Sequence, residues 1–253
     1  MCFDLDSLPP VPPLAGAAVS HEDLVLEAAD GNRLAAFVAL PDDGGGATGV
    51  VVLPDVRGLY RFYEELALRF AERGRPAVAI DWFGRTAGVA KRGEDFDYME
   101  HVAQTTPEGT QADIGAAVAY LRSPQGGNCG AVVTVGFCFG GHISWLAAAA
   151  GHGIAGAVGF YGMPGERGGR PGPTQRAHEL AAPILGLMGG ADANIPPAVV
   201  AEFEAALREA GVEHEIVSYG GAPHSFFDRK QEQFQDASDD AWRRTLAFVD
   251  AHA

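Results

Sequence analysis

The stretch Val133-Thr134-Val135-Gly136-Phe137-Cys138-Phe139-Gly140-Gly141 decides the fold of this chain. The apolar residues 131–135 predict a buried strand, and residues 139–150 predict a helix that begins almost at once. The glycines two before and two after Cys138 allow strand and helix to approach closely around a sharp turn. Such a turn presents the thiol at the carboxyl edge of the sheet and at a helix N-terminus, where the helix dipole favours a thiolate. The stretch therefore predicts a nucleophile elbow that carries cysteine.

The alternation of strand and helix continues on both sides of this elbow. Because the apolar strands do not alternate with polar residues, we expect a mostly parallel sheet covered by helices on both faces. Residues 83–106 and 162–176 are predicted to be long loops, and Thr106 is the predicted N-cap of a helix. Strands are predicted at residues 49–54, 77–81, 131–135, 154–160, 183–188 and 213–219, and helices at 60–73, 107–122, 139–150, 196–210 and 237–252.

The N-terminal part of the chain follows a different pattern. Residues 19–28 and 32–40, joined by Ala-Asp-Gly-Asn, predict an antiparallel hairpin. The proline-rich residues before them predict an extended strap over residues 1–18. We therefore expect one α/β domain at residues 19–253, with an antiparallel hairpin at its N-terminal end.

Charge and cysteine content exclude several classes of function. The 253 residues carry 33 acidic and 18 basic side chains, a net charge of −15 that repels nucleic acid and anionic lipid. Residues 123–165 contain no charged side chain, but their glycines interrupt every apolar run that could span a membrane. Cys2, Cys129 and Cys138 are too few and too widely spaced for a disulfide framework or a zinc site. With no basic start to a signal peptide, the cytoplasm is the expected location.

Two further groups follow the nucleophile in the chain order of an α/β-hydrolase, which is nucleophile, acid and histidine. Asp192 follows the predicted strand 183–188, and His224 follows the predicted strand 213–219. Both would lie at the same sheet edge as Cys138. An aspartate that orients an imidazole, which in turn takes the thiol proton, is a general arrangement for activating a nucleophile. The Phe139 amide would face the oxyanion that forms when Cys138 attacks a carbonyl.

The remaining histidines and cysteines have less specific patterns. His142 competes with His224 as the base because it lies four residues after Cys138. It is expected to be packed or hydrogen-bonded one turn into a buried helix, pointing away from the site. Cys2 and Cys129 are expected to be inert, since Cys129 precedes its strand and so lies at the opposite edge of the sheet.

From about residue 24 to residue 249 the chain resembles the dienelactone hydrolase (carboxymethylenebutenolidase) family of α/β-hydrolases. The motifs that carry the resemblance are Gly136-Phe-Cys138-Phe-Gly-Gly, Met188-Gly-Gly-Ala-Asp192 and His224-Ser-Phe. The resemblance implies that Cys138, Asp192 and His224 form the catalytic triad. It also implies that Asp55 is a carboxylate beside the thiol, where the best-known members carry glutamate, and that Val56 supplies a second oxyanion amide.

The same resemblance implies three substrate-binding residues. Arg85, in Asp-Trp-Phe-Gly-Arg, matches an arginine that binds a substrate carboxylate. The second arginine of the family corresponds to Asp228 here, so Arg229, one residue later, is the candidate. Tyr161 matches an aromatic residue of the pocket. For both arginines a solvated surface position is the alternative.

The predicted reaction is acyl transfer through a thioester, with no metal or organic cofactor. The expected partner is a small lactone or ester, with or without a carboxylate, and the chain is expected to be a monomer or a small homo-oligomer. One alternative keeps the triad but takes bulkier or neutral esters or thioesters. Another is a catalytically silent member of the fold that acts as a binding protein.

Overall fold

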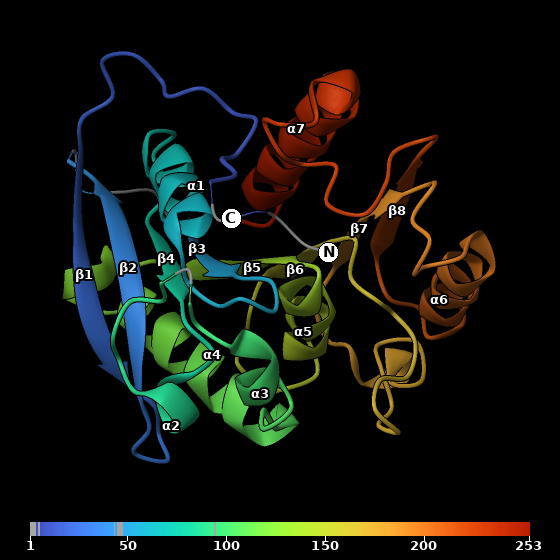
Figure 1. The fold of residues 1–253 in the computed structure, drawn as a ribbon, viewed down its shortest axis with the longest axis horizontal. Helices are drawn as coiled ribbons and strands as arrows, with labels where there is room; N and C mark the ends of the chain where they lie inside the picture. Colours follow the sequence, from blue (N-terminus) through green and yellow to red (C-terminus); the bar gives the residue numbers. More distant parts are fainter. Residues whose placement is uncertain (1–3, 5, 43, 45–47, 94) are drawn as a thin grey trace.

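A twisted sheet of eight strands runs through the molecule in the order β1-β2-β4-β3-β5-β6-β7-β8 (Figure 1). The computed structural model describes residues 4, 6–42, 44, 48–93 and 95–253. Strands β1, β2 and β4 pair antiparallel and all other neighbours pair parallel, which confirms the predicted hairpin and the mostly parallel sheet. The strands are β1 Val19–Glu27, β2 Arg33–Pro41, β3 Thr48–Leu53, β4 Ala77–Ile80, β5 Ala131–Phe137, β6 Gly156–Phe160, β7 Ile184–Gly189 and β8 His214–Tyr219.

Helices cover both faces of the sheet, as predicted. Helices α1 and α7 lie on one face, and α4, α5 and α6 lie on the other (Figure 1). Helix α4 begins as expected, because the Thr106 hydroxyl accepts a hydrogen bond from the Gly109 amide at 3.1 Å and Pro107 occupies the first turn. The longer helices are α1 Arg61–Ala71, α4 Pro107–Arg122, α5 Phe139–Ala147, α6 Pro197–Glu209 and α7 Gln235–Ala251, with short 3₁₀ turns at Pro124–Gly126, Ala177–Glu179 and Glu232–Phe234.

Residues 83–106 and strand β5 are two of the places where the structure differs from the sequence prediction. Residues 83–106 are not wholly a loop, because they contain the short helices α2, Gly84–Ala87, and α3, Tyr98–Val102. Stacking of Phe96 on His101, with ring centroids 4.8 Å apart, holds this segment together, and no local periodicity reveals such a contact. Strand β5 also extends two residues past the predicted end, since Phe137 still pairs with Phe160 of β6.

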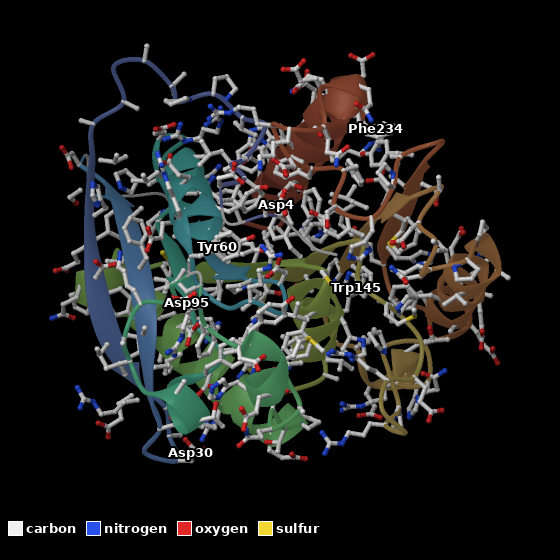
Figure 2. The ribbon with its side chains drawn as sticks, in the orientation of Figure 1. Asp4, Asp30, Tyr60, Asp95, Trp145 and Phe234 are labelled. Atoms are coloured by element: carbon white, nitrogen blue, oxygen red, sulfur yellow. The ribbon has the colours of Figure 1, made fainter. Side chains whose placement is uncertain are left out.

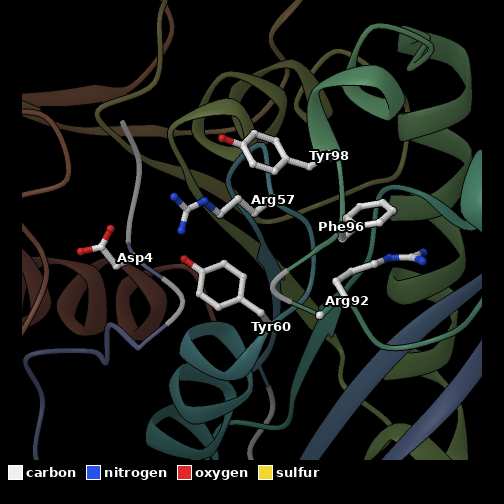
Figure 3. A pocket seen from close by; sticks show the side chains of 7 residues that line it. Asp4, Arg57, Tyr60, Arg92, Phe96 and Tyr98 are labelled. Atoms are coloured by element: carbon white, nitrogen blue, oxygen red, sulfur yellow. The ribbon is translucent and has the colours of Figure 1, made fainter.

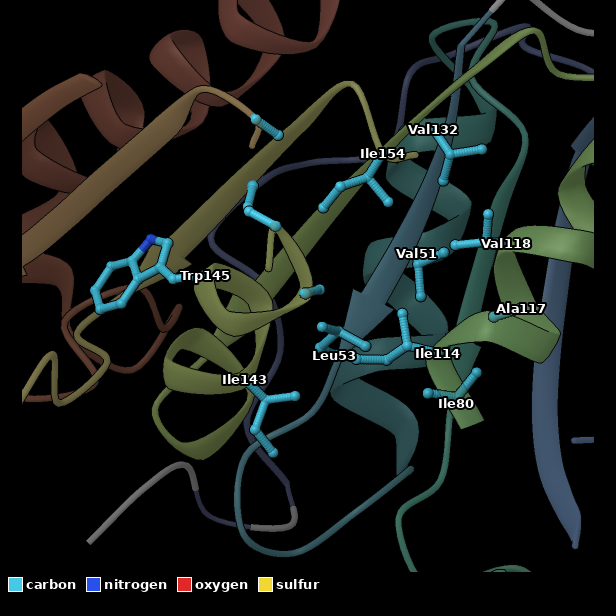
Figure 4. Close-up of a cluster of buried hydrophobic side chains, with 14 of the residues drawn as sticks. Val51, Leu53, Ile80, Ile114, Ala117, Val118, Val132, Ile143, Trp145 and Ile154 are labelled. Carbon is cyan, nitrogen blue, oxygen red and sulfur yellow. The ribbon is translucent and has the colours of Figure 1, made fainter. Parts of the chain in front are cut away.

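Each face of the sheet has its own hydrophobic core. Val51 and Leu53 of β3 face α4 and α5 (Figure 4), whereas the intervening Val50 and Val52 pack on the side of α1 and α7. Successive side chains of one strand point to opposite faces, so a strand that is buried on both faces is apolar throughout. This is the physical origin of the unbroken apolar runs in the sequence.

The described part of the N-terminal segment packs along the C-terminal part of the chain. Ser7 is fully buried and its hydroxyl donates a hydrogen bond to Asp228 at 2.6 Å. The Arg229 amide donates to the Leu8 carbonyl at 3.0 Å, and the Leu14 amide donates to Glu72, the residue after α1. Residues 1–3 and 5 of the predicted strap, including Cys2, lie outside the described residues. Within the ranges described above, no helix has the length and apolar content needed to cross a membrane.

Candidate active site

Cys138 occupies the sharp turn between β5 and α5. Its backbone has φ 53° and ψ −110°, a conformation that is strained for a residue with a side chain and that persists only where the surroundings enforce it. A methyl group on Gly136 would overlap the Gly140 carbonyl, and one on Gly140 would overlap the Leu53 carbonyl. The elbow therefore needs both glycines, and it places Cys138 directly before the first residue of α5.

His224 and Asp192 meet on the loops that follow β8 and β7. The His224 Nδ1 atom lies 2.6 Å from Asp192 Oδ2, and the side chain of Asp192 is only 1% exposed. Burial alone would raise the pKa of Asp192. The hydrogen bond with His224 and that from the Asn194 amide, at 2.9 Å, outweigh burial and leave the pKa below its ordinary value. The carboxylate is thus held ionised against the imidazole.

A single glycine allows the two loops to lie so close together. A Cβ atom on Gly189, at the end of β7, would lie 2.6 Å from the carbonyl oxygen of Pro223, the residue before His224. Any larger residue would push the loop that carries Asp192 away from the loop that carries His224. The glycine in the Met-Gly-Gly-Ala-Asp motif therefore has a direct geometric role in forming the pair.

The thiol and the imidazole line one cavity of about 230 Å³. Tyr161 lies beside His224, with ring centroids 5.0 Å apart, and has a left-handed backbone with φ 37°. The structure thus brings together most of the residues expected at the site. The lining residues are Val56, Cys138, Phe139, His142, Tyr161, Met163, Arg167, Asn194, Ile195 and His224.

Trp82 contacts the backbone next to Val56 and the ring of Phe139, the two candidate oxyanion residues. Its indole N–H donates to the carbonyls of Pro54 and Asp55 at 3.1 and 3.2 Å, and so fixes the backbone just before Val56. The indole also packs against Phe139 in a T-shaped contact, with ring centroids 5.6 Å apart. The backbone that leads to Val56 and the first residue of α5 are therefore both anchored to one buried side chain.

Asp55 is fully buried next to Val56. Its carboxylate accepts hydrogen bonds from the Arg57 amide at 2.8 Å and from the Tyr60 hydroxyl at 3.5 Å. Arg57 and Tyr60 themselves line a second cavity, of about 260 Å³, together with Phe96 and Tyr98 among others (Figure 3). Asp55 is thus supported by residues of this second cavity, while its neighbour Val56 lines the cavity of the thiol.

The structure does not bring Arg85 to the thiol cavity. Its guanidinium donates to Asp30 at 2.5 Å, to Asp113 at 2.8 Å and to the Gly109 carbonyl at 3.1 Å. Asp30 lies in the turn at the outer end of the β1–β2 hairpin (Figure 2). Burial raises the pKa of Asp113 to about 6, although Asn32 and Arg85 both oppose that rise. Arg85 therefore ties the hairpin to α4, a structural position in place of the expected substrate contact.

Arg229 likewise lies away from the described lining of the cavity. Its side chain is exposed, and its amide binds the Leu8 carbonyl of the N-terminal segment. The preceding Asp228 is buried and accepts the Ser7 hydroxyl. The one-residue offset in the sequence thus buries the carboxylate of Asp228 and leaves the guanidinium of Arg229 exposed to solvent.

His142 requires a correction. It is hydrogen-bonded as predicted, with Nδ1 2.6 Å from the Met163 carbonyl, but its side chain lines the thiol cavity and does not point away from it. The reason is that His142 is in the first turn of α5, still at the elbow end. Burial, assisted by the charge of Arg167 and opposed by the Met163 carbonyl, lowers the pKa of His142 to about 4. At neutral pH it is therefore an uncharged wall of the cavity.

Four lining residues are not predicted from the sequence. Met163 and Arg167 lie in the loop after β6, and Asn194 and Ile195 lie in the loop after β7. The Arg167 guanidinium stacks over the Phe139 ring, with Cζ 4.3 Å from the centroid. The signal was available in the sequence, because residues 162–176 are rich in arginine and follow a strand that ends at the catalytic edge.

Cys129 is buried just before β5, at the opposite edge of the sheet from Cys138. Burial raises the pKa of its thiol to about 11, so it is protonated and unreactive at neutral pH. In the described part of the chain, no three His, Cys, Asp or Glu side chains are grouped so that they could hold a metal ion.

The sheet order, the elbow, and the acid and histidine on successive strand ends define a protein of the α/β-hydrolase fold. Residues 34–253 match the family model described as "Dienelactone hydrolase family", and the chain belongs to this family of carboxylic ester hydrolases.

Named relatives agree with this assignment. The chain is 31% identical to "Putative carboxymethylenebutenolidase" of Escherichia coli K12, in an alignment of 258 positions that covers 95% of this chain and 93% of the relative. A Bradyrhizobium protein named "Probable 2-oxo-3-(5-oxofuran-2-ylidene)propanoate lactonase" is 27% identical over 88% of this chain and 91% of its own. A crystal structure titled "Putative Dienelactone Hydrolase from Klebsiella pneumoniae" superposes with a TM-score of 0.80 at 27% identity, over 92% of this chain and 98% of that one.

Proposed function

We propose that this protein hydrolyses enol-lactones or activated esters, with Cys138 as nucleophile, His224 as general base and Asp192 as the group that orients it. The observation that carries the proposal is the 2.6 Å contact of Asp192 with His224, whose imidazole lines the same cavity as a cysteine on a strained elbow. Two of the three groups are already engaged with each other, and the third lines the cavity with the imidazole.

The reaction has two halves. Because Nδ1 of His224 faces Asp192, Nε2 takes the Cys138 proton, and the thiolate attacks the substrate carbonyl carbon. The Phe139 and Val56 amides stabilise the resulting oxyanion. The carbon–oxygen bond of the ester then breaks, and His224 returns the proton to the departing enol or alcohol. In the second half His224 takes a proton from water, the hydroxide attacks the thioester, and the thiol leaves with that proton as the acid is released.

A thiol nucleophile favours substrates with good leaving groups. A thiolate departs from the tetrahedral adduct more easily than an ordinary alkoxide does, so the adduct of an unactivated ester returns to substrate. An enolate or phenolate competes with the thiolate and lets the reaction proceed. The lactone-directed names of the relatives support the same substrate class. We retain for the buried Asp55 the role of a carboxylate beside the thiol, and for Tyr161 that of a pocket wall next to His224.

Trapping of the acyl-enzyme tests the proposal. With 4-nitrophenyl acetate, acid quenching during turnover should leave an acetyl group on the peptide that contains Cys138, and hydroxylamine should remove it. Cys138→Ala should lose both the label and the turnover. Cys129→Ala, which removes the buried thiol at the other edge of the sheet, is the matched control and should retain both. Turnover that survives in Cys138→Ala would disprove the assignment of the nucleophile.

A second candidate is the hydrolysis of bulkier or neutral esters and thioesters by the same groups. It is favoured by the positions of Arg85 and Arg229, neither of which lies among the described residues that line the cavity. A turnover screen of carboxylated lactones beside neutral aryl esters distinguishes the two. If Arg85 acts on substrate after all, Arg85→Gln should impair only the carboxylated set.

A further inference from the structure

We propose that the thiol cavity continues into a groove where Arg167 and Arg170 bind a carboxylate at the far end of an elongated ester substrate. The inference rests on the proposed function and extends it by naming the substrate class. It differs from the expectation based on the family, because these arginines come from the loop after β6 and not from the segments of Arg85 and Arg229.

The cavity and the groove share a wall. The groove has a volume of about 350 Å³, larger than the cavity that contains Cys138. Phe139, His142 and Arg167 line both spaces, so the groove begins at the wall of the thiol cavity. Beyond this wall the groove is lined by apolar side chains of α3 and α5, among them Val102, Ile143 and Leu146, which suit a hydrocarbon chain.

The charge along the groove is opposite to that of the molecule. The described lining includes three arginines and no acidic side chain, although the whole chain has 33 acids against 18 basic residues. Arg176 is paired with Glu179, at 2.6 and 3.1 Å, and its charge is therefore largely compensated. Among the described residues, no ion pair is found for Arg170. The groove is thus a local positive patch on an acidic protein.

A tight turn holds two of these arginines side by side. The Arg167 amide donates to the Arg170 carbonyl at 3.0 Å, and the Arg170 amide donates to the Arg167 carbonyl at 3.1 Å. The two residues between them, Gly168 and Gly169, have φ values of 57° and 73°, which a two-residue hairpin turn of type I′ requires. Residues paired in this way present their side chains on the same face, with Cβ atoms roughly 5 Å apart.

This arrangement suits an anionic group. Both arginines line the groove, and the turn places their side chains on one face. A carboxylate between the two guanidinium groups would make a charge-assisted contact with each. Stacking of Arg167 on Phe139 at 4.3 Å further fixes one of the two guanidinium groups next to the residue that follows the nucleophile.

The substrate is therefore an ester or enol-lactone with its carbonyl at Cys138, an apolar stretch beside Ile143 and Leu146, and a terminal carboxylate at the turn. Matched probes follow from this description. They are the mono-4-nitrophenyl esters of succinic and adipic acid, each compared with the methyl ester of its free carboxyl group. The measured quantity is the ratio of kcat/KM for the acid to kcat/KM for its methyl ester.

We expect the wild-type ratio to be clearly higher for the adipate pair than for the succinate pair, because only the longer chain reaches the turn. The double variant Arg167→Gln, Arg170→Gln should lower the adipate ratio about tenfold or more, as for the loss of a charged hydrogen bond. Arg208→Gln is the matched control, because this exposed arginine of α6 is paired with Glu204 and should leave both ratios unchanged.

The outcomes separate the two proposals. An adipate ratio that is unchanged in the double variant, or equal to the succinate ratio in the wild type, would overturn the groove assignment. In either case the methyl esters would still be hydrolysed in a manner that depends on Cys138. If the methyl esters are turned over equally well by Cys138→Ala, the proposed function fails instead. A fall of the adipate ratio toward one as sodium chloride is raised is expected for an exposed ion pair, and insensitivity to salt would count against it.

Discussion

Replacing His142 by asparagine should make the folded protein less sensitive to acid. His142 is 7% exposed and its Nδ1 atom lies 2.6 Å from the Met163 carbonyl. Asparagine can place an N–H group near the same oxygen but does not titrate. The pKa of His142 is lowered from 6.5 to about 4 in the folded chain, chiefly by burial. Between these two values the unfolded chain binds the proton and the folded chain does not. Stability therefore falls as the pH is lowered.

The size of this effect follows from the two pKa values. Each pKa unit corresponds to about 1.4 kcal/mol, so lowering the pH from neutral to about 4 should cost the wild type about 3 kcal/mol through this histidine alone. Urea denaturation of wild type and His142→Asn at both pH values isolates the term, because the carboxylates titrate in both proteins. His178→Asn, at an exposed position, is the control and should keep the wild-type loss. Equal losses in wild type and His142→Asn would refute the conclusion that the buried imidazole is held neutral.

Three shorter predictions test the framework of the site. Asp192→Asn should reduce kcat/KM on an activated ester by about 100-fold or more and slow the alkylation of Cys138 by iodoacetamide. Unchanged alkylation would show that Asp192 and His224 do not activate the thiol. Gly189→Ala, whose Cβ would lie 2.6 Å from the Pro223 carbonyl, should abolish most activity while circular dichroism shows an intact fold, and full activity would mean that the loops can separate harmlessly. Arg85→Gln should lower the free energy of unfolding in urea by about 1–2 kcal/mol, because Asp113 loses its ion pair. Turnover of neutral aryl esters should stay within about twofold of wild type. A stability equal to that of wild type would show that Arg85 has no structural role.

The local chemistry around the elbow was predictable from the sequence. Gly136 and Gly140, on either side of Cys138, fit a turn that only small residues permit. They predict both the close contact of strand and helix and the position of the thiol. The positions of Asp192 and His224 followed from the parallel sheet, because strands that run in one direction bring the residues after them to one edge. These are consequences of short motifs and of topology.

The residues that line the cavity depend on longer-range packing and were harder to predict. Arg85 lies in a motif that resembles a substrate-binding segment, yet two acids distant in the sequence, Asp30 and Asp113, hold its guanidinium elsewhere. The sequence predicts that His142 points away, because a residue one turn into a buried helix is expected to be packed against its neighbours. Only the register of the first turn of α5 reveals that its side chain still reaches the cavity.

Position 228, where the family resemblance implies an arginine, carries a buried aspartate that the surrounding residues accommodate. A buried aspartate four residues after His224 needs a hydrogen-bond donor, and Ser7 of the N-terminal segment supplies one at 2.6 Å. An arginine at this position would place a guanidinium, which only donates hydrogen bonds, against the hydroxyl of the buried Ser7. Any positive charge needed at the catalytic edge must therefore come from another loop at that edge. The loop after β6 carries Arg167, which lines the cavity beside Phe139. The loop after β6 thus brings a cation to the same sheet edge as Cys138 and His224.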